Sequence, residues 1–248
     1  MIENVIYKEN LKMIISKPDI CKDKYMVLFI HGGAWTSGNA ECFLKNMQYF
    51  ERLGIISASV DYRTENSVIE DCVEDCAAAV LWLKENAQRI GFDRDKIIAF
   101  GESAGGHIAA VLGTPSMLKN KNAQVCLTVN CNAVCDLTGN WMGAVKKERT
   151  FIDTYKRAYA ISPIWHVSPD NSPQIIVHGL KDTDVLPQDN LNYYYELKKF
   201  GVKSDIILLP EEKHAFILFD YYAPHDTVVK IMDKIADKIN EYLKEEND

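Results

Sequence analysis

The sequence predicts an α/β fold in which helices cover a mostly parallel β-sheet. Short apolar runs typical of strands alternate with segments whose apolar residues recur at helical spacing. The runs are apolar throughout, as expected of parallel strands that are covered on both faces. One of them, residues 97–100, leads through a glycine-rich turn into a helix that starts with small residues. These features predict strand–helix units in series along the chain.

The individual elements follow from the same patterns. A leading hairpin or pair of edge strands is expected between residues 4 and 16, and Gly54 and Gly201 are expected to end two of the helices. The later strands are expected at residues 25–30, 55–60, 97–100, 125–129, 173–178 and 204–209. Helices are expected within residues 43–54, 69–88, from 104 onward, 188–201 and 228–243.

One segment, residues 136–168, departs from this alternation. It carries aromatic residues among charged ones and shows no strand pattern. An excursion of that length on the side where the strands end predicts a small lid or cap. The alternative is a helical insertion that packs elsewhere. The chain shows no internal repeat or linker, so residues 1–248 are expected to form a single domain.

Composition excludes several classes of partner. The 248 residues are 47% hydrophobic and 25% charged, with a formal net charge of −7 and no dense run of Lys or Arg. This balance argues against nucleic acid or an anionic membrane as the main partner. No apolar stretch approaches the roughly 20 residues that span a bilayer. The first residues lack the pattern of a secretory signal, so we expect a cytoplasmic protein.

The seven cysteines are expected to be reduced and packed. The chain has no Cys-x-x-Cys pair, and no histidine lies near its cysteines at zinc-finger spacing. No metal site is therefore predicted.

The turn after residues 97–100 contains Gly-x-Ser-x-Gly, with Ser103 at its centre. Gly-x-Ser-x-Gly between a strand and a helix is the pattern of a nucleophile elbow, in which a strained turn lifts the serine hydroxyl out of the sheet. Such a turn requires small neighbours, and Gly101 and Gly105 are small. The alternative is a glycine-rich turn with an incidental serine. The context favours Ser103 as a nucleophile.

A nucleophilic serine needs a base and a carboxylate that orients it. His214 follows the last expected strand, on a loop at the carboxyl edge of the sheet, and is the best candidate for the base. The loop after residues 173–178 supplies two candidates for the acid, Asp182 and Asp184, and spacing alone does not choose between them. The histidines set aside are His31, expected to brace its own loop, and His107, His166, His178 and His225.

The oxyanion of an acyl-transfer intermediate needs N–H donors that are already aimed at it. The N–H of Ala104, directly after the nucleophile, is one candidate. Gly32 and Gly33 can bring their N–H groups close without obstruction from a side chain. Trp35 and Phe216, which flank these loops, are expected to contribute to substrate binding.

These motifs together resemble those of an α/β-hydrolase. The chain is most similar to the carboxylesterases related to hormone-sensitive lipase, including the kynurenine-formamidase-like branch. The resemblance rests on His-Gly-Gly-Ala-Trp, Val-Asp-Tyr-Arg, Gly-Glu-Ser-Ala-Gly-Gly-His, His-Gly-x-x-Asp-x-x-Val and His-Ala-Phe, in that order. It implies an α/β-hydrolase fold and a triad of Ser103, Asp182 and His214, and so chooses Asp182 over Asp184. Asp184 stands where the family more often has an apolar residue, and Thr64–Ser67 also departs from the usual pattern.

The expected function is that of a cytoplasmic serine hydrolase acting on a small-molecule ester, with no metal or organic cofactor. An amidase-type acyl hydrolase such as an arylformamidase would use the same machinery. A binding protein on this scaffold is the third possibility, although it would need none of the three triad residues.

Overall fold

The computed structural model describes residues 1–139 and 155–245. They contain an eight-stranded sheet in the order β1-β2-β4-β3-β5-β6-β7-β8. The strands are β1 (Ile2–Lys8), β2 (Leu11–Ser16), β3 (Met26–Ile30), β4 (Ile56–Val60), β5 (Ile97–Glu102), β6 (Leu127–Cys131), β7 (Gln174–Gly179) and β8 (Ser204–Leu209). The α-helices are α1 (Leu44–Leu53), α2 (Ile69–Ile90), α3 (Ala104–Leu112), α4 (Tyr155–Ala160), α5 (Pro187–Lys199) and α6 (His225–Glu245). Short 3₁₀ helices are η1 (Ala40–Phe43), η2 (Pro115–Met117), η3 (Lys121–Ala123) and η5 (Pro163–His166).

The sheet is mostly parallel. The leading hairpin β1–β2 is antiparallel and joins the sheet through an antiparallel pairing of β2 with β4. From β4 through β8, each neighbouring pair of strands runs parallel. The fold class predicted from the sequence is confirmed.

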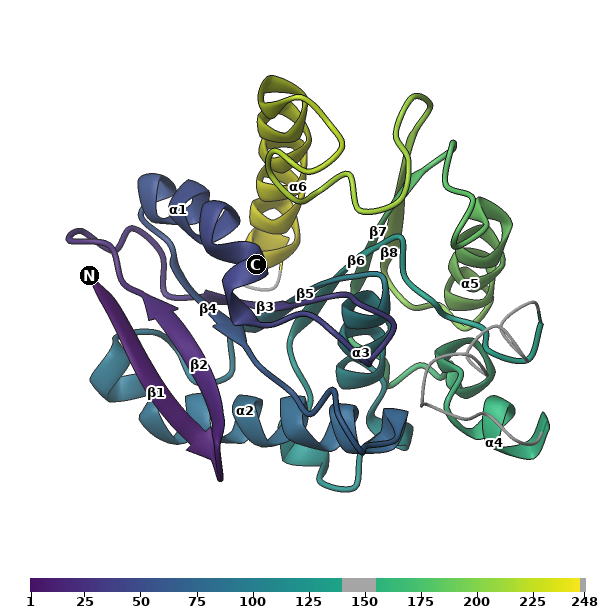
Figure 1. Cartoon of the computed structure of the whole chain (residues 1–248), viewed down its shortest axis with the longest axis horizontal. Helices are drawn as coiled ribbons and strands as arrows, with labels where there is room; N and C mark the ends of the chain where they lie inside the picture. Colours follow the sequence, from purple (N-terminus) through teal and green to yellow (C-terminus); the bar gives the residue numbers. More distant parts are fainter. Residues whose placement is uncertain (140–154, 246–248) are drawn as a thin grey trace.

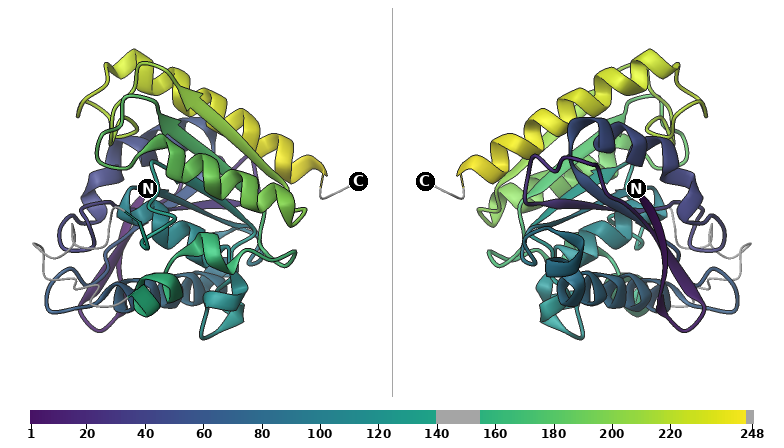
Figure 2. Two further views of the ribbon diagram at one scale, coloured as in Figure 1. Left: turned by 90° about the vertical axis from the view of Figure 1, so that its right-hand side faces the viewer. Right: turned by 90° about the vertical axis from the view of Figure 1, so that its left-hand side faces the viewer.

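Helices cover both faces of this sheet because its central strands are apolar on both sides. Every residue of β3 is buried, as is every residue of β5. One face packs against α2 and α3, with α5 beside β7 and β8, and the other packs against α1 and α6. Figure 1 shows α1 and α6 on one side of the strands and α2 on the other, and the same three layers are visible in Figure 2.

The predicted strand at residues 125–129 is displaced by two residues. The observed strand β6 runs from Leu127 to Cys131 and includes Asn130. The apolar run suggested an earlier end, but the Asn130 amide is buried and donates hydrogen bonds to Thr128 Oγ1 at 3.1 Å and Gln174 Oε1 at 2.7 Å. A buried polar side chain with such partners is compatible with a core strand.

The described ends of the 136–168 segment lie against α2 and α3. Arg157 forms a two-pronged ion pair with Glu70 of α2, with N–O distances of 2.9 and 2.7 Å. A ring nitrogen of His107 in α3 lies 2.8 Å from the carbonyl oxygen of Ile161. These contacts hold the described part of the segment beside α2 and α3. The predicted lid otherwise falls on residues 140–154, which lie outside the described residues.

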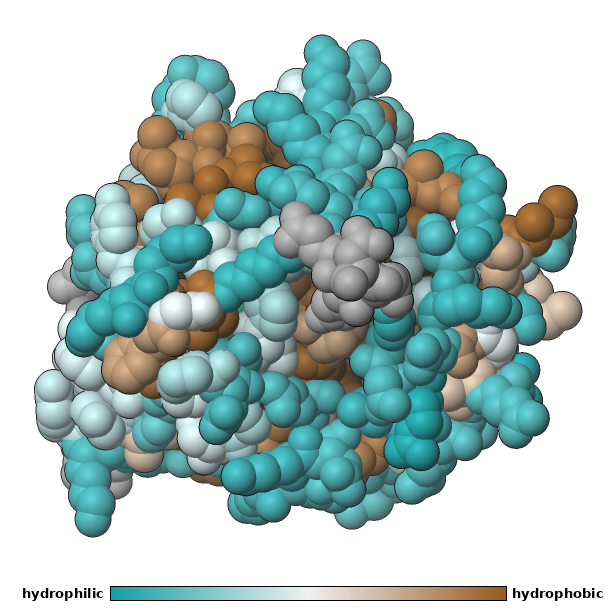
Figure 3. Space-filling view, turned by 180° about the vertical axis from the view of Figure 1, so that it is seen from behind, coloured by the Kyte–Doolittle hydropathy of each residue, from teal (hydrophilic) through white to brown (hydrophobic). Residues whose placement is uncertain are grey.

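Among the described helices, none is both long and apolar enough to cross a membrane. Seen from behind, the surface is mostly hydrophilic, and its hydrophobic residues form separate patches (Figure 3).

Candidate active site

A pocket of about 690 Å³ opens at the carboxyl ends of the parallel strands. Its floor includes Ser103, and its walls come from three loops that follow β3, β7 and β8. The carboxyl edge of a parallel sheet is where α/β proteins usually bind ligands, because the loops between strands and helices converge there. The lining residues are Gly32, Gly33, Ala34, Ser37, Gly38, Cys42, Glu102, Ser103, Thr183, Asp184, His214, Ala215, Leu218, Tyr221 and Tyr222.

Ser103 occupies a sharp turn between β5 and α3. Its φ of 55° lies in the left-handed region that non-glycine residues rarely adopt, which is the backbone strain expected of a nucleophile elbow. The turn is tight: a Cβ at Gly101 would lie 2.0 Å from the carbonyl oxygen of Gly105. A Cβ at Gly105 would lie 2.0 Å from the carbonyl oxygen of Ile30. Both flanking glycines are therefore required by close backbone approach.

Ser103, His214 and Asp182 form a continuous chain of contacts. The serine Oγ lies 2.8 Å from Nε2 of His214, and Nδ1 of the same ring lies 2.7 Å from Oδ2 of Asp182. A carboxylate only accepts hydrogen bonds, so Nδ1 carries the ring proton and its N–H donates a hydrogen bond to Asp182. Nε2 is then free to accept the hydroxyl proton of Ser103.

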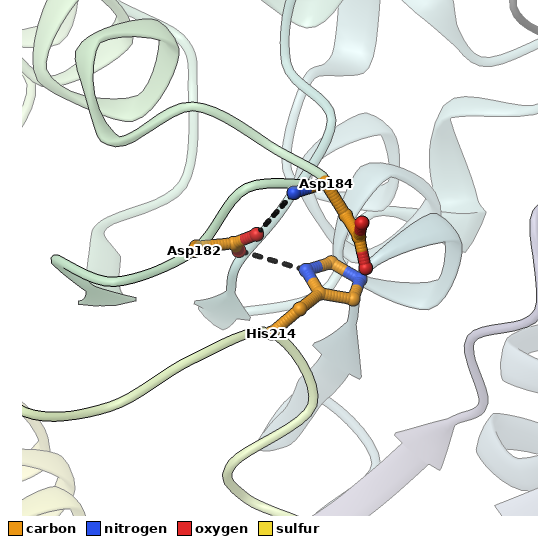
Figure 4. Close-up of side chains that lie close together, drawn as sticks. All are labelled: Asp182, Asp184 and His214. Carbon is orange, nitrogen blue, oxygen red and sulfur yellow. Dashed lines mark hydrogen bonds and ion pairs between the residues drawn. The ribbon is translucent and has the colours of Figure 1, made fainter.

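Asp182 is fixed in place by its own hydrogen bonds. It is 3% exposed, and its Oδ1 accepts from the backbone N–H groups of Asp184 and Val185 at 2.9 and 3.0 Å. Figure 4 shows the Asp182 carboxylate between the Asp184 backbone and the imidazole of His214. The hydrogen bond from the His214 ring goes to Asp182 and not to Asp184, whose side chain is exposed. The geometry joins the first of the two candidate carboxylates to the histidine.

Asn132, which none of the sequence motifs includes, ties the loops together. It follows β6 with a φ of 43°, accepts from the backbone N–H of Gly179 at 3.0 Å, and donates to the carbonyl oxygen of Lys213 at 3.4 Å. Its side chain thus links the ends of β6 and β7 to the residue before His214. In the sequence, the only sign of this role was that a polar residue directly follows a buried strand.

Glu102 is a second residue to which the sequence motifs assign no role. It is 3% exposed, and its Oε1 lies 3.5 Å from Nε2 of His214 and lacks a hydrogen-bond partner among the described residues. Burial raises the pKa of the Glu102 carboxyl to about 7, while the nearby His214 opposes that shift.

The basicity of His214 reflects two opposing effects. Burial of the ring lowers the pKa of the imidazole. The hydrogen bond with Asp182 and the charge of Glu102 outweigh this effect, with a further contribution from Asp184, so the pKa is raised above its ordinary value. The ring is therefore a stronger base than a free histidine.

The glycines predicted to form the oxyanion hole lie against the nucleophile. A Cβ on Gly32 would lie 3.2 Å from the Cβ of Ser103, and Gly33 has a φ of +104°. Among the described residues, no backbone hydrogen bond takes up the N–H groups of Gly32, Gly33 or Ala104. Gly32 and Gly33 line the pocket together with Ser103, and Ala104 follows the serine directly in the chain.

The loop that carries the two glycines is braced by His31 and Tyr62. The two rings stack with centroids 4.1 Å apart, and the Tyr62 hydroxyl donates to the carbonyl oxygen of His31 at 2.8 Å. This is the bracing role expected of His31. Burial lowers the pKa of its imidazole.

Comparisons with known proteins agree with this geometry. The BD-FAE family model matches residues 13–197, which is most of the chain. The chain therefore belongs to the BD-FAE family. Esterase LipC of Mycobacterium tuberculosis is 26% identical over 219 residues, covering 79% of this chain and 54% of LipC. An arylesterase of Saccharolobus solfataricus is 29% identical over 215 residues, covering 77% of this chain and 68% of that enzyme.

A similar fold is seen in a solved esterase, Est2 of Thermogutta terrifontis. The two structures superpose with a TM-score of 0.83 at 26% identity, covering 96% of this chain and 90% of Est2. Est2 has also been solved with propionate bound, with butyrate bound and phosphonylated by sarin. Against LipC and the probable carboxylic ester hydrolase LipM, in contrast, the chain spans about half of the relative's length.

Two residues predicted to bind substrate lie elsewhere in this member of the BD-FAE family. Trp35 is fully buried, and its indole N–H donates to Nδ1 of His107 at 3.3 Å. Phe216 is also fully buried, in the apolar cluster beneath α1 and α6. Large aromatic side chains gain most from burial, so both turn from the loop into the core. The exposed aromatic residues of the pocket are Tyr221 and Tyr222, on the loop between β8 and α6.

Proposed function

We propose that this protein is a serine hydrolase that cleaves small carboxylic esters through an acyl-enzyme. The observation that carries the proposal is the chain of contacts from Ser103 through His214 to Asp182 at the floor of an open pocket. A nucleophile, a base and a group that orients the base are the parts that acyl transfer requires. The esterase relatives support the same reaction class.

In the proposed mechanism, Ser103 Oγ attacks the ester carbonyl carbon while Nε2 of His214 takes the hydroxyl proton. The carbonyl oxygen becomes an oxyanion, which accepts hydrogen bonds from the N–H groups of Gly32, Gly33 and Ala104. His214 then gives its proton to the leaving alcohol, and the acyl group remains on Ser103. A water molecule repeats the cycle and releases the acid. Asp182 holds the imidazole in the tautomer that each step needs.

The proposed chemistry uses only these protein groups, and the substrate is a small-molecule ester. The finer assignment, to the branch similar to hormone-sensitive lipase and the kynurenine formamidases, rests on the motifs around Gly32 and Ser103. A cytoplasmic location and a single domain over residues 1–248 remain predictions from the sequence.

The test combines turnover with labelling of the nucleophile. Purified protein should hydrolyse p-nitrophenyl acetate, and an organophosphonate should inactivate it while adding one phosphonyl group to the peptide that contains Ser103. Ser103→Ala should lower kcat by on the order of a thousandfold or more and should take up no label. N-formylkynurenine assayed in parallel separates an arylformamidase from an esterase. Absence of both turnover and labelling in correctly folded protein would overturn the proposal.

A further inference from the structure

The pocket beside Ser103 is lined by acidic residues without basic ones. Among the described residues that line it, the charged side chains are Glu102 and Asp184, with His214 between them in the reaction path. No lysine or arginine belongs to that described lining. The local field therefore favours a positive group and disfavours a negative one in the pocket.

Asp184 is the acidic residue of this lining whose carboxylate is left available for a ligand. One of its carboxylate oxygens lies within 4.8 Å of both a ring nitrogen of His214 and a carboxylate oxygen of Asp182. Figure 4 shows the Asp184 side chain directed toward the imidazole. Asp182 is engaged by three donors, whereas no hydrogen bond or ion pair within the described residues takes up the exposed Asp184 carboxylate.

Glu102 adds to the same field when its carboxyl is ionised, and because burial raises its pKa to about 7, that contribution grows as the pH rises through neutrality. Its side chain is almost completely buried, lines the pocket, and leaves Oε1 without a hydrogen-bond partner among the described residues. A buried carboxylate is screened less by water and salt than an exposed one. The pocket thus has an acidic group at its floor and another at its wall.

The wall formed by the loop between β8 and α6 is also suited to a cation. Tyr221 and Tyr222 are 61% and 63% exposed, and their ring centroids lie 4.4 Å apart at an interplanar angle of 67°. Both line the pocket together with Leu218. The faces of phenol rings attract ammonium groups, and the rings also offer apolar contact to the carbons around the charge.

The reaction path brings the leaving alcohol next to Asp184. The ester oxygen must approach Nε2 of His214 closely to receive its proton. Because the Asp184 carboxylate lies within 4.8 Å of a ring nitrogen of His214, a charged group a few bonds beyond the ester oxygen comes within its reach. When His214 carries the transferred proton, the carboxylates of Asp182 and Asp184 still leave the site negative.

We propose that the natural substrates are esters of amino alcohols, in which an ammonium group close to the ester oxygen is bound by Asp184. The inference rests on the proposed function and adds the charge of the alcohol to it. Asp184 is then a specificity-determining residue, and Glu102 and the two tyrosines support the same preference.

The experiment compares three acetate esters that differ in charge. They are acetylcholine, its neutral isostere 3,3-dimethylbutyl acetate, and the anionic 3-acetoxypropanoate. We expect kcat/KM to be about tenfold higher for the cationic ester than for the neutral one, and lowest for the anionic ester. The preference should shrink as salt is raised from about 20 to about 500 mM, since salt screens exposed charges.

Asp184→Asn removes the charge but keeps the backbone N–H that Asp182 accepts. In this variant the ratio of kcat/KM for the cationic to the neutral ester should fall severalfold toward one, and the contributions of Glu102 and the two tyrosines should account for any preference that remains. Asp19→Asn is the matched control, because this exposed aspartate lies in the loop before β3, at the opposite edge of the sheet, and its variant should keep the wild-type ratio.

The ratio of kcat/KM for the cationic to the neutral ester does not change when a substitution lowers activity on all esters equally. Equal rates on the cationic and neutral esters in the wild type, or an unchanged ratio in Asp184→Asn, would overturn the inference alone. A folded protein that cleaves neither p-nitrophenyl acetate nor any of the three esters, and whose Ser103 takes up no organophosphonate, would instead overturn the proposed function.

Discussion

The two halves of the pocket are built differently. The half that would carry the reaction is buried and packed: Ser103 is 8% exposed, Asp182 is 3% exposed, and backbone atoms crowd the glycines beside them. The half that would meet the rest of the substrate is exposed, with Asp184, Tyr221 and Tyr222 at its surface. The comparison shows that burial and close backbone contacts restrict which residues can occupy the reacting half. The exposed side chains of the other half are under far fewer packing restrictions.

The largest expected effect is a loss of kcat, and it tests whether Asp182 belongs to the reacting half of the pocket and Asp184 to the recognition half. Asp182→Asn should lower kcat by about a thousandfold or more, because an amide in place of the carboxylate favours the wrong tautomer of His214. Asp184→Asn should lower kcat for p-nitrophenyl acetate far less. Steady-state kinetics of both variants on that neutral ester decide the matter. The reverse ranking would transfer the orienting role to Asp184.

The next effect concerns the packed glycines. Gly33→Ala should lower kcat by about a hundredfold or more, because an alanine disfavours the φ of +104° and its Cβ would lie 2.4 Å from the carbonyl oxygen of Ser37. Displacing this loop moves the proposed oxyanion donors away from the carbonyl oxygen.

Gly201→Ala is the control for that variant. Gly201 also has a positive φ, of +73°, but no described atom lies within 4 Å of the position that a Cβ would take there, and the residue follows α5 far from the pocket. Both variants should show a reduced melting temperature, and only Gly33→Ala should lose kcat. Full activity of Gly33→Ala on p-nitrophenyl acetate would remove Gly33 from the proposed oxyanion hole.

The smallest effect lies at the boundary between the halves, at Glu102. Activity should fall as the pH drops through the raised pKa of His214, because the general base must be neutral. Glu102→Gln removes a negative charge that raises this pKa, so the acid limb should move to lower pH.

The pH profile of kcat/KM on p-nitrophenyl acetate measures that shift. Asp19→Asn should leave the profile unchanged. An acid limb that stays in place in Glu102→Gln, or moves to higher pH, would show that Glu102 does not act on the His214 base.

The sequence predicted the packed half well. The order of strands and helices and the meeting of Ser103 with His214 agree with the structure, because apolar runs and the glycine-flanked turn leave few other arrangements. Spacing left Asp182 and Asp184 as equal candidates for the acid, and the family resemblance implied Asp182, which contacts His214 in the structure. The sequence predicted the recognition half poorly. Trp35 and Phe216 are apolar loop neighbours of the site, and nothing in their spacing revealed that they turn into the core.

The tyrosines of the pocket wall were missed for the same reason. Tyr221 and Tyr222 lie on a loop without periodicity, so their position depends on how the chain returns from β8 to α6. Glu102 and Asn132 are polar residues at strand ends, where a role was detectable but its geometry was not. Contacts between loops depend on tertiary packing, which local patterns do not encode.

The left-handed backbone of Ser103 has a consequence for the evolution of this chain. Such strain in a non-glycine residue costs on the order of 1–3 kcal/mol, a sizeable share of the stability of an ordinary domain. Glycine at this position would relieve the strain and raise the free energy of unfolding, but it would remove the proposed nucleophile. Selection for robustness alone would therefore erase the serine, and its presence in so costly a conformation records selection for what it does.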